Sequence, residues 1–196
     1  MKVEEAKKLV KPHLTTARYE HTLRVAETAV QLAQRYAYEG SIEKVALAAI
    51  FHDYAKYRPL DEMKRWITES FLPKDLLDYH HELWHGPVGS ILIDREYGIN
   101  DPEIREAIYY HTTGRANMGK LEMIVFLADY IEPGRNFPGL DEVREMAQQD
   151  LVKACWMVSR NNIDYLMKQE ATIYPDTFHA YNDLTRHNGG NTHDKK

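Results

Sequence analysis

The sequence AAIFHDYAK, residues 48–56, decides both the fold and the site. A small apolar run ends in the adjacent pair His52 and Asp53, and Lys56 follows one helical turn later. A carboxylate at the start of a core costs several kcal/mol unless it is paired or binds a cation. The pair therefore predicts that a polar partner or a bound cation inside the core contacts both the imidazole and the carboxylate.

Most of the chain shows the periodicity of helices. Apolar residues recur at three- and four-residue steps, and in the first long segment they leave only a narrow polar arc, which is typical of a helix deep in a bundle. This stripe consists of Leu23, Ala26, Val30, Ala33 and Ala37. Gly, Pro and Ser signals at the segment ends predict helices at 16–38, 42–53, 60–70, 73–79, 86–97, 102–111, 120–132, 140–148, 150–170 and 176–186. We therefore expect an all-α helical bundle.

Length and charge limit the classes of function. The chain has 196 residues and a net charge of −5, with both signs spread along it. No basic block indicates a nucleic-acid polymer as partner, and no polybasic helix indicates a membrane surface. The longest apolar run, 45–51, is too short to span a bilayer. We expect a cytoplasmic protein with one domain at 1–187, a flexible tail at 188–196, and its one cysteine, Cys155, in the core.

Six polar residues fall at positions where the helical pattern expects the core or its edge. They are His21, His52, Asp53, His85, His111 and Asp129, on five separate predicted helices or helix ends. Each alone has an ordinary explanation, such as a satisfied core histidine or a salt bridge to a buried arginine. Together, imidazoles and carboxylates suit iron, manganese or zinc. A carboxylate beside a ligating histidine, such as Asp53, can bridge two metals that share a hydroxide for attack on phosphorus.

A rival pattern is HELWH at 81–85, which matches the H-E-x-x-H zinc motif with Glu82 as base. That motif needs one continuous helix, whereas Gly86 and Pro87 follow it at once. It also leaves the other polar core residues without a role. We therefore expect only His85 from this stretch to be a ligand, with His80 and His81 on the surface.

The order His21, His52-Asp53 and Asp129 resembles the HD-domain metal-dependent phosphohydrolases, and His85 with His111 resembles the members that hold two metals. Six longer motifs are RYEHTLRVAETA at 18–29, FHDYAK at 51–56, WHGPVG at 84–89, HTTG at 111–114, LADYIEPGRNFPG at 127–139 and TIYPDTFHAYN at 172–182. Over nearly the whole chain they are similar to the YqeK family of bacterial HD proteins. That resemblance implies symmetrical hydrolysis of diadenosine tetraphosphate to two ADP.

The resemblance also implies roles for the ligands. One metal would be held by His21, His52, Asp53 and Asp129, and the second by Asp53 as a bridge with His85 and His111. The family is associated with iron, and the ligand set would also admit manganese.

Further residues would meet the substrate. Asp53, Lys56 and Arg135 would be catalytic. Lys56, Arg135 and Arg18 would contact phosphate oxygens. Three cations around two metals suit a polyanion. His21, His111 and Thr112 would lie against the substrate. The nucleoside would meet Thr172, Ile173, Tyr174, Pro175, Asp176 and Thr177, with Tyr174 a candidate for stacking on the base.

Other functions remain open from the sequence. The same ligands would serve a 5′-nucleotidase, a (p)ppGpp hydrolase, or a nucleotide sensor that binds without hydrolysis. A purely structural bundle would leave the six polar residues unexplained. The native metal, the oligomeric state, the physiological dinucleotide and the role of His179 are not determined by the sequence.

Overall fold

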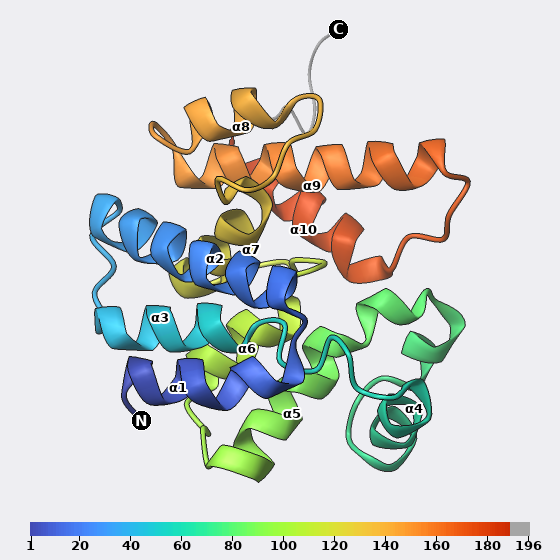
Figure 1. Ribbon diagram of the computed structural model, residues 1–196. Helices are drawn as coiled ribbons and strands as arrows, with labels where there is room; N and C mark the ends of the chain where they lie inside the picture. The colour runs from blue at the N-terminus through green and yellow to red at the C-terminus, as the bar shows by residue number, and fades with distance from the viewer. Residues whose placement is uncertain (189–196) are drawn as a thin grey trace, which may run out of the picture.

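The computed structural model describes residues 1–188, and within this range the chain is a bundle of α-helices without a strand (Figure 1). The helices are α1 (Val3–Val10), α2 (Thr16–Arg35), α3 (Ile42–Phe51), α4 (Leu60–Glu69), α5 (His85–Tyr97), α6 (Pro102–Tyr110), α7 (Lys120–Ile131), α8 (Leu140–Met146), α9 (Leu151–Lys168) and α10 (Pro175–His187). Short 3-10 helices lie at Lys11–His13, Lys74–Asp78 and His81–Leu83. The predicted all-α fold is confirmed, and all of the predicted tail except Asn188 lies outside the described residues.

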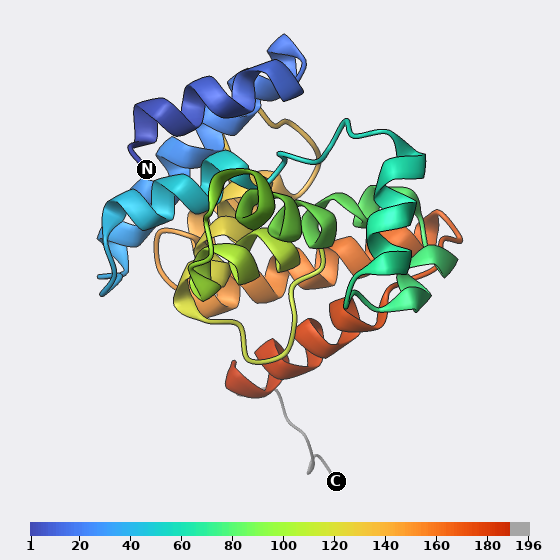
Figure 2. The same ribbon diagram turned by 90° about the horizontal axis from the view of Figure 1, so that it is seen from below.

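Helix α7 runs through the middle of the bundle. It packs against α2, α6 and α9, while α2 also packs along α3, and α5 packs along α6. Figure 1 shows α9 crossing above α7 with α10 beside it, and Figure 2 shows α4 at the edge of the bundle. No helix in the described range combines the length and apolarity that a membrane crossing requires.

The helix ends follow local signals in the sequence. Side-chain oxygens of Thr15, Ser41, Asp101 and Asp150 accept hydrogen bonds from the first backbone N–H groups of α2, α3, α6 and α9. These caps satisfy donors that have no partner within the helix. Gly98 ends α5 with a φ of 67°, a left-handed conformation that glycine adopts without steric cost.

The helix predicted at 73–79 is only a 3-10 helix, Lys74–Asp78, and α1, α2 and α3 also differ from the sequence prediction. Helix α2 ends at Arg35 rather than at 38, because Ala37 turns left-handed (φ 46°) and the N–H of Tyr38 donates to the carbonyl of Ala33. Helix α3 ends at Phe51, two residues before the predicted end. Helix α1 was not predicted; it has only eight residues and depends on packing against α3 for its stability.

The apolar residues of α3 and α7 form much of the core. Every residue of α3 from Val45 to Phe51 is buried, and so are Ile124 to Ala128 of α7. Cys155 of α9 is also buried, as predicted. Burying the larger of these side chains, such as valine, leucine, isoleucine and phenylalanine, stabilises the fold by about 1.5–3 kcal/mol each. The polar site residues at the end of α3 are thus attached to one of the most deeply buried segments.

A pair of isoleucines on α3 tests this packing. Ile50 is fully buried, whereas Ile42 at the start of the same helix is 38% exposed. We expect Ile50→Ala to lower the free energy of unfolding by about 2–5 kcal/mol, because it leaves a cavity. Ile42→Ala is the matched control and should cost no more than about 0.5 kcal/mol. Urea unfolding of both variants measures the difference, and equal losses would contradict the assignment of α3 to the core.

Candidate metal centre

The ends and inner faces of five helices bring the six predicted polar residues together. They are His21 on α2, His52 and Asp53 after α3, His85 at the start of α5, His111 after α6, and Asp129 on α7. All are buried except Asp129, whose side chain is 20% exposed. Their ligand atoms form three overlapping groups, each within 4.8 Å. The prediction that they share one site agrees with this geometry.

The end of α3 explains how adjacent residues reach one cluster. His52 is the C-cap of α3 and keeps helical backbone angles, and the chain continues in tight turns. The N–H of Tyr54 donates to the carbonyl of Phe51, and the N–H of Lys56 donates to that of Asp53. Asp53 is therefore placed by a turn and not by the regular period of the helix.

The two carboxylate oxygens of Asp53 face different histidines. Its Oδ2 lies 3.2 Å from Nε2 of His52 and 3.7 Å from Nε2 of His21. Its Oδ1 lies 3.1 Å from Nε2 of His85 and 3.9 Å from Nε2 of His111. Burial raises the pKa of Asp53, but the neighbouring imidazoles of His52 and His85 outweigh it and hold that pKa well below its usual range. One ionised carboxylate thus stands between two pairs of imidazoles.

Asp129 completes one side of the cluster. Its Oδ1 lies 3.0 Å from Nε2 of His21 and 3.9 Å from Nε2 of His52. The same oxygen accepts a hydrogen bond from the guanidinium of Arg135 at 2.6 Å. Asp129 is therefore paired with an arginine, as its ordinary explanation expects, and it also contacts two histidines of the cluster.

Backbone contacts fix the orientation of three imidazoles. Nδ1 of His52, His85 and His111 lies 2.6, 2.6 and 2.7 Å from the carbonyl oxygen three residues earlier. A carbonyl only accepts, so each Nδ1 carries the proton and donates. In the neutral imidazole each Nε2 then carries a lone pair that points into the cluster, which is the form in which histidine ligates a metal.

The resulting lone pairs lack partners. Nε2 of His85 and Nε2 of His111 lie 3.0 Å apart, although both are acceptors in this tautomer. Nε2 of His21 and of His52 are buried and make no hydrogen bond among the described residues. Burial, followed by the neighbouring imidazoles, lowers the pKa of His111 to about 3, so a proton is a poor partner there. Four inward lone pairs and two carboxylates fit a divalent metal with nitrogen and oxygen ligands.

Glu132 supports His21 and was missed by the sequence analysis. The residue is 2% exposed and lies just after α7. Its Oε1 accepts from Nδ1 of His21 at 3.0 Å, and its Oε2 accepts from Nε of Arg24 at 2.6 Å and from the N–H of Gly134. These donors outweigh burial and lower the pKa of Glu132. The spacing of Glu132 three residues after Asp129 was the available signal, since it places both near one helix face.

The predicted phosphate-binding cations surround the cluster. Arg18 donates to Oδ2 of Asp53 at 3.0 Å, and Arg135 donates to both the carboxylate and the backbone carbonyl of Asp129. Lys56 forms an ion pair with Glu82, whose side chain is 54% exposed. All three cations keep part of their side chain accessible, so they border the buried ligands on the solvent side.

The stretch 81–85 does not form the alternative zinc motif. A 3-10 helix covers His81–Leu83, and α5 begins only at His85. His81 is exposed and its ring stacks on that of His80, with centroids 4.4 Å apart. His81 and His85 therefore do not share one helical face, and only His85 joins the cluster.

The predicted nucleoside segment, 172–177, leads into α10. Its Tyr174 is 6% exposed, and the ring packs edge to face against Tyr79 with centroids 5.0 Å apart. Thr172 and Pro175 are exposed, whereas Thr177 is buried. The segment thus presents mainly its backbone and small side chains, because the ring of Tyr174 is occupied by packing.

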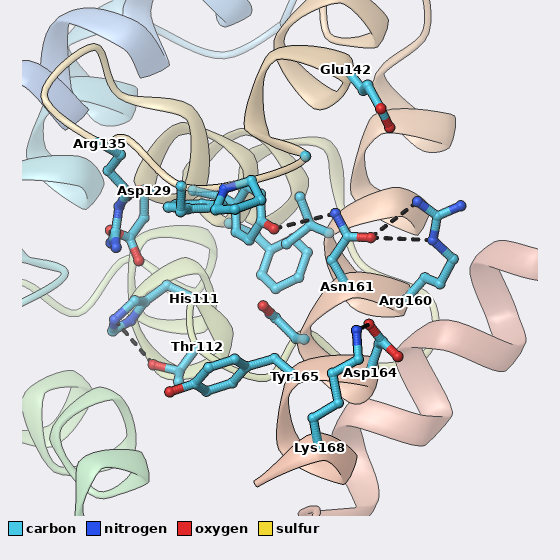
Figure 3. Close-up of a pocket in the computed structure, with 17 residues that line it drawn as sticks. His111, Thr112, Asp129, Arg135, Glu142, Arg160, Asn161, Asp164, Tyr165 and Lys168 are labelled. Atoms are coloured by element: carbon cyan, nitrogen blue, oxygen red, sulfur yellow. Dashed lines mark hydrogen bonds and ion pairs between the residues drawn. The ribbon is translucent and has the colours of Figure 1, made fainter.

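A pocket of about 790 Å³ opens directly onto the cluster (Figure 3). His111, Thr112, Asp129 and Arg135 line one end of it, and side chains of α9 line the other. The hydroxyl oxygen of Thr112 lies 3.2 Å from Nε2 of His111. The volume falls in the range of about 300–1,000 Å³ that is typical of small-molecule sites. The candidate metals would therefore be reached from a pocket large enough for an organic ligand.

Comparison with known proteins agrees with this arrangement. The family model described as HD domain matches residues 18–134, the range that contains all six cluster residues. The chain belongs to the HD-domain family. Its fold is also similar to a solved structure from Clostridium acetobutylicum described as a predicted HD superfamily hydrolase involved in NAD metabolism. That match has a TM-score of 0.88 and 36% identity, and covers 95% of this chain and 98% of the other.

Curated relatives match nearly the whole of this HD-domain chain. A protein of Bacillus subtilis is 49% identical and covers 93% of this chain and 97% of its own length. A protein of Staphylococcus aureus is 45% identical, and the match covers 93% of this chain and 94% of that protein. Both are named symmetrical bis(5′-nucleosyl)-tetraphosphatase. The resemblance to the YqeK family predicted from the motifs is therefore confirmed.

The contact between Glu132 and His21 predicts a loss of metal affinity. We expect Glu132→Gln to weaken binding of divalent metal by about 10–100-fold, because the partner of a ligating histidine orients the ring and raises its basicity. Competition with a chromogenic chelator measures the affinity.

Glu122→Gln is the matched control for this variant. Glu122 is also a buried glutamate, 4% exposed, but it pairs with Arg115 at 2.6 Å outside the cluster. The Glu122→Gln variant should be less stable than the unmodified protein but should bind metal with the same affinity. Equal affinities in the two variants would contradict the role of Glu132.

The low pKa of His111 predicts an acid sensitivity of the metal-free protein. Its folded-state pKa of about 3 lies below the usual 6.5, so the unfolded chain binds the proton first as the pH falls. Stability should then fall as the pH decreases from about 6.5 toward about 3, by up to about 1.4 kcal/mol per pH unit for this one proton. Urea unfolding after chelation measures the slope. His111→Gln should flatten it, and an unchanged slope would contradict the prediction.

Proposed function

We propose that this protein hydrolyses diadenosine tetraphosphate symmetrically to two ADP. The observation that carries the proposal is Asp53, whose two oxygens face two pairs of histidines at the end of a ligand-sized pocket. The names of the relatives from Bacillus subtilis and Staphylococcus aureus support the choice of substrate. Both relatives match over nearly their full length, so the proposal concerns the whole described chain.

The proposed cofactor is a pair of divalent metals, with iron preferred and manganese possible. One would be held by His21, His52, Asp53 and Asp129, and the other by Asp53, His85 and His111. Nitrogen and oxygen ligands in this ratio suit both metals. When bound, two such ions act as Lewis acids toward phosphoryl oxygens and lower the pKa of water.

The residues of the chain would orient the substrate and balance its charge. Arg135 and Arg18 lie next to the carboxylates Asp129 and Asp53, so each can offer remaining N–H donors to phosphate oxygens. Lys56 can exchange its ion pair with the exposed Glu82 for a phosphate at small cost. These cations would offset the charge that spreads over the phosphoryl oxygens in the transition state.

The remaining predicted residues would position the rest of the substrate. The hydroxyl of Thr112 and the imidazoles of His21 and His111 would contact the polyphosphate, and Thr112 and His111 line the pocket. We retain the segment Thr172–Thr177 as the proposed contact for a nucleoside, through its backbone and small side chains. A single domain at 1–187 and a cytoplasmic location also remain proposals.

The product pattern tests this function. Protein loaded with iron or manganese without oxygen is incubated with diadenosine tetraphosphate, and the nucleotides are separated by ion exchange. We expect ADP as the only product. AMP with ATP would contradict symmetrical cleavage. Binding without turnover would favour the sensor, and release of phosphate or pyrophosphate from other nucleotides would favour another HD-type activity.

Asp53→Asn tests the role of the bridging carboxylate in the same assay. We expect the rate to fall by more than about 100-fold together with the metal content, because one substitution weakens both metal positions. Asp61→Asn on α4 replaces an exposed aspartate outside the cluster and should change neither quantity. A variant of Asp53 with normal metal content and normal rate would contradict the proposed arrangement.

A further inference from the structure

The pocket next to the cluster has a second wall that the proposed roles do not use. From His111 and Asp129 it extends to α9, where Asn161, Asn162 and Tyr165 line it. Figure 3 shows the side chains of α9 facing the pocket across from His111 and Thr112. None of the residues 172–177 lines this pocket. The α9 wall, defined here as Asn161, Asn162, Tyr165 and Lys168, is therefore distinct from the proposed nucleoside segment.

The spacing of these residues places them on one side of the helix. Asn161, Tyr165 and Lys168 follow one another at steps of four and three residues, so they are neighbours along one face. The side-chain amide of Asn161 donates to the hydroxyl of Tyr130 at 3.3 Å, and its oxygen accepts from Arg160 at 3.0 Å. The wall thus combines a fixed polar group with side chains that remain accessible.

Tyr165 is the unusual member of the wall. The residue is 63% exposed, although it is a large hydrophobic residue and lines a pocket. In Figure 3 its ring extends from α9 toward Thr112, at the end of the pocket that holds the cluster. An accessible aromatic face beside a polyphosphate site suits stacking with a nucleobase. Asn162, three residues earlier, adds an amide of the kind that pairs with the N6 and N7 edge of adenine.

A symmetrical dinucleotide requires two nucleoside-binding sites. Cleavage in the middle of the tetraphosphate centres the polyphosphate on the cluster, and a nucleoside then extends from each side. The segment Thr172–Thr177 can serve one of them only. The pocket volume of about 790 Å³ leaves room for a second nucleoside on the other wall.

We propose that the α9 wall binds the second nucleoside of the dinucleotide, with Tyr165 stacking on its base. This inference rests on the proposed function. It assigns the preference for a dinucleotide over a mononucleotide polyphosphate to α9, since only a substrate with two nucleosides occupies both places.

Two substrates that differ by one nucleoside test the inference. With Tyr165→Ala we expect the KM for diadenosine tetraphosphate to rise about tenfold, because one stacking contact is lost. The KM for adenosine 5′-tetraphosphate should not change, since its single nucleoside occupies the other place. If that compound is bound without being cleaved, its inhibition constant against the dinucleotide replaces the KM. Tyr165→Phe keeps the aromatic face and should behave like the unmodified protein.

Met167→Ala is the matched control. Met167 is 64% exposed on the same helix, two residues from Tyr165, and does not line the pocket. It should leave both constants unchanged. An unchanged KM for the dinucleotide in Tyr165→Ala, or an equal rise for both substrates, would overturn the inference. Failure of the unmodified, metal-loaded protein to release ADP would instead contradict the proposed function, so the two failures are distinguishable.

Discussion

The buried carboxylate of Asp53 is the constraint on which the rest of the site depends. It is 2% exposed and lies within 4 Å of the Nε2 atoms of four histidines. A charge in such a place is stable only when positive charge faces it. Arg18 supplies part of that charge from 3.0 Å, whereas neutral imidazoles, the form that ligates a metal, supply none. A metal cation between the carboxylate and the neutral imidazoles would supply the rest, which accounts for so many polar groups in the core.

The helices hold these imidazoles by two different devices. Three histidines donate from Nδ1 to a carbonyl within their own turn, so the backbone alone sets the tautomer. His21 lies in the middle of α2, where the backbone carbonyls are engaged in the helix, and it relies on the carboxylate of Glu132 instead. Arg24 from the same helix neutralises that carboxylate. The support of His21 is therefore ionic, whereas the support of the others is a property of helix ends.

Two arginines border the open side of the cluster, and their charge suits the anionic ligand of the proposed function. Arg18 and Arg135 contact the ligand carboxylates directly, so their charge lies at the mouth of the site and not in bulk solvent. The pocket continues from there to α9, which packs on α7 and so is tied to Asp129. A short phosphate ester would fill only the inner end. Under the proposed function, the pocket joins the cluster, where the reaction would occur, to a nucleoside bound on α9.

The local sequence pattern alone determined most of the helices and the candidate ligands. The apolar periods of 42–53 and 120–132 predicted α3 and α7 to within two residues, and polar residues inside those periods indicated the ligands. The left-handed turn at Ala37, the contact of Glu132 with His21 and the face of α9 in the pocket were decided only by the tertiary structure. His21 and Glu132 are 111 residues apart in the chain. Periodicity records which face of a helix is buried, but which side chains meet across that face depends on how the helices pack.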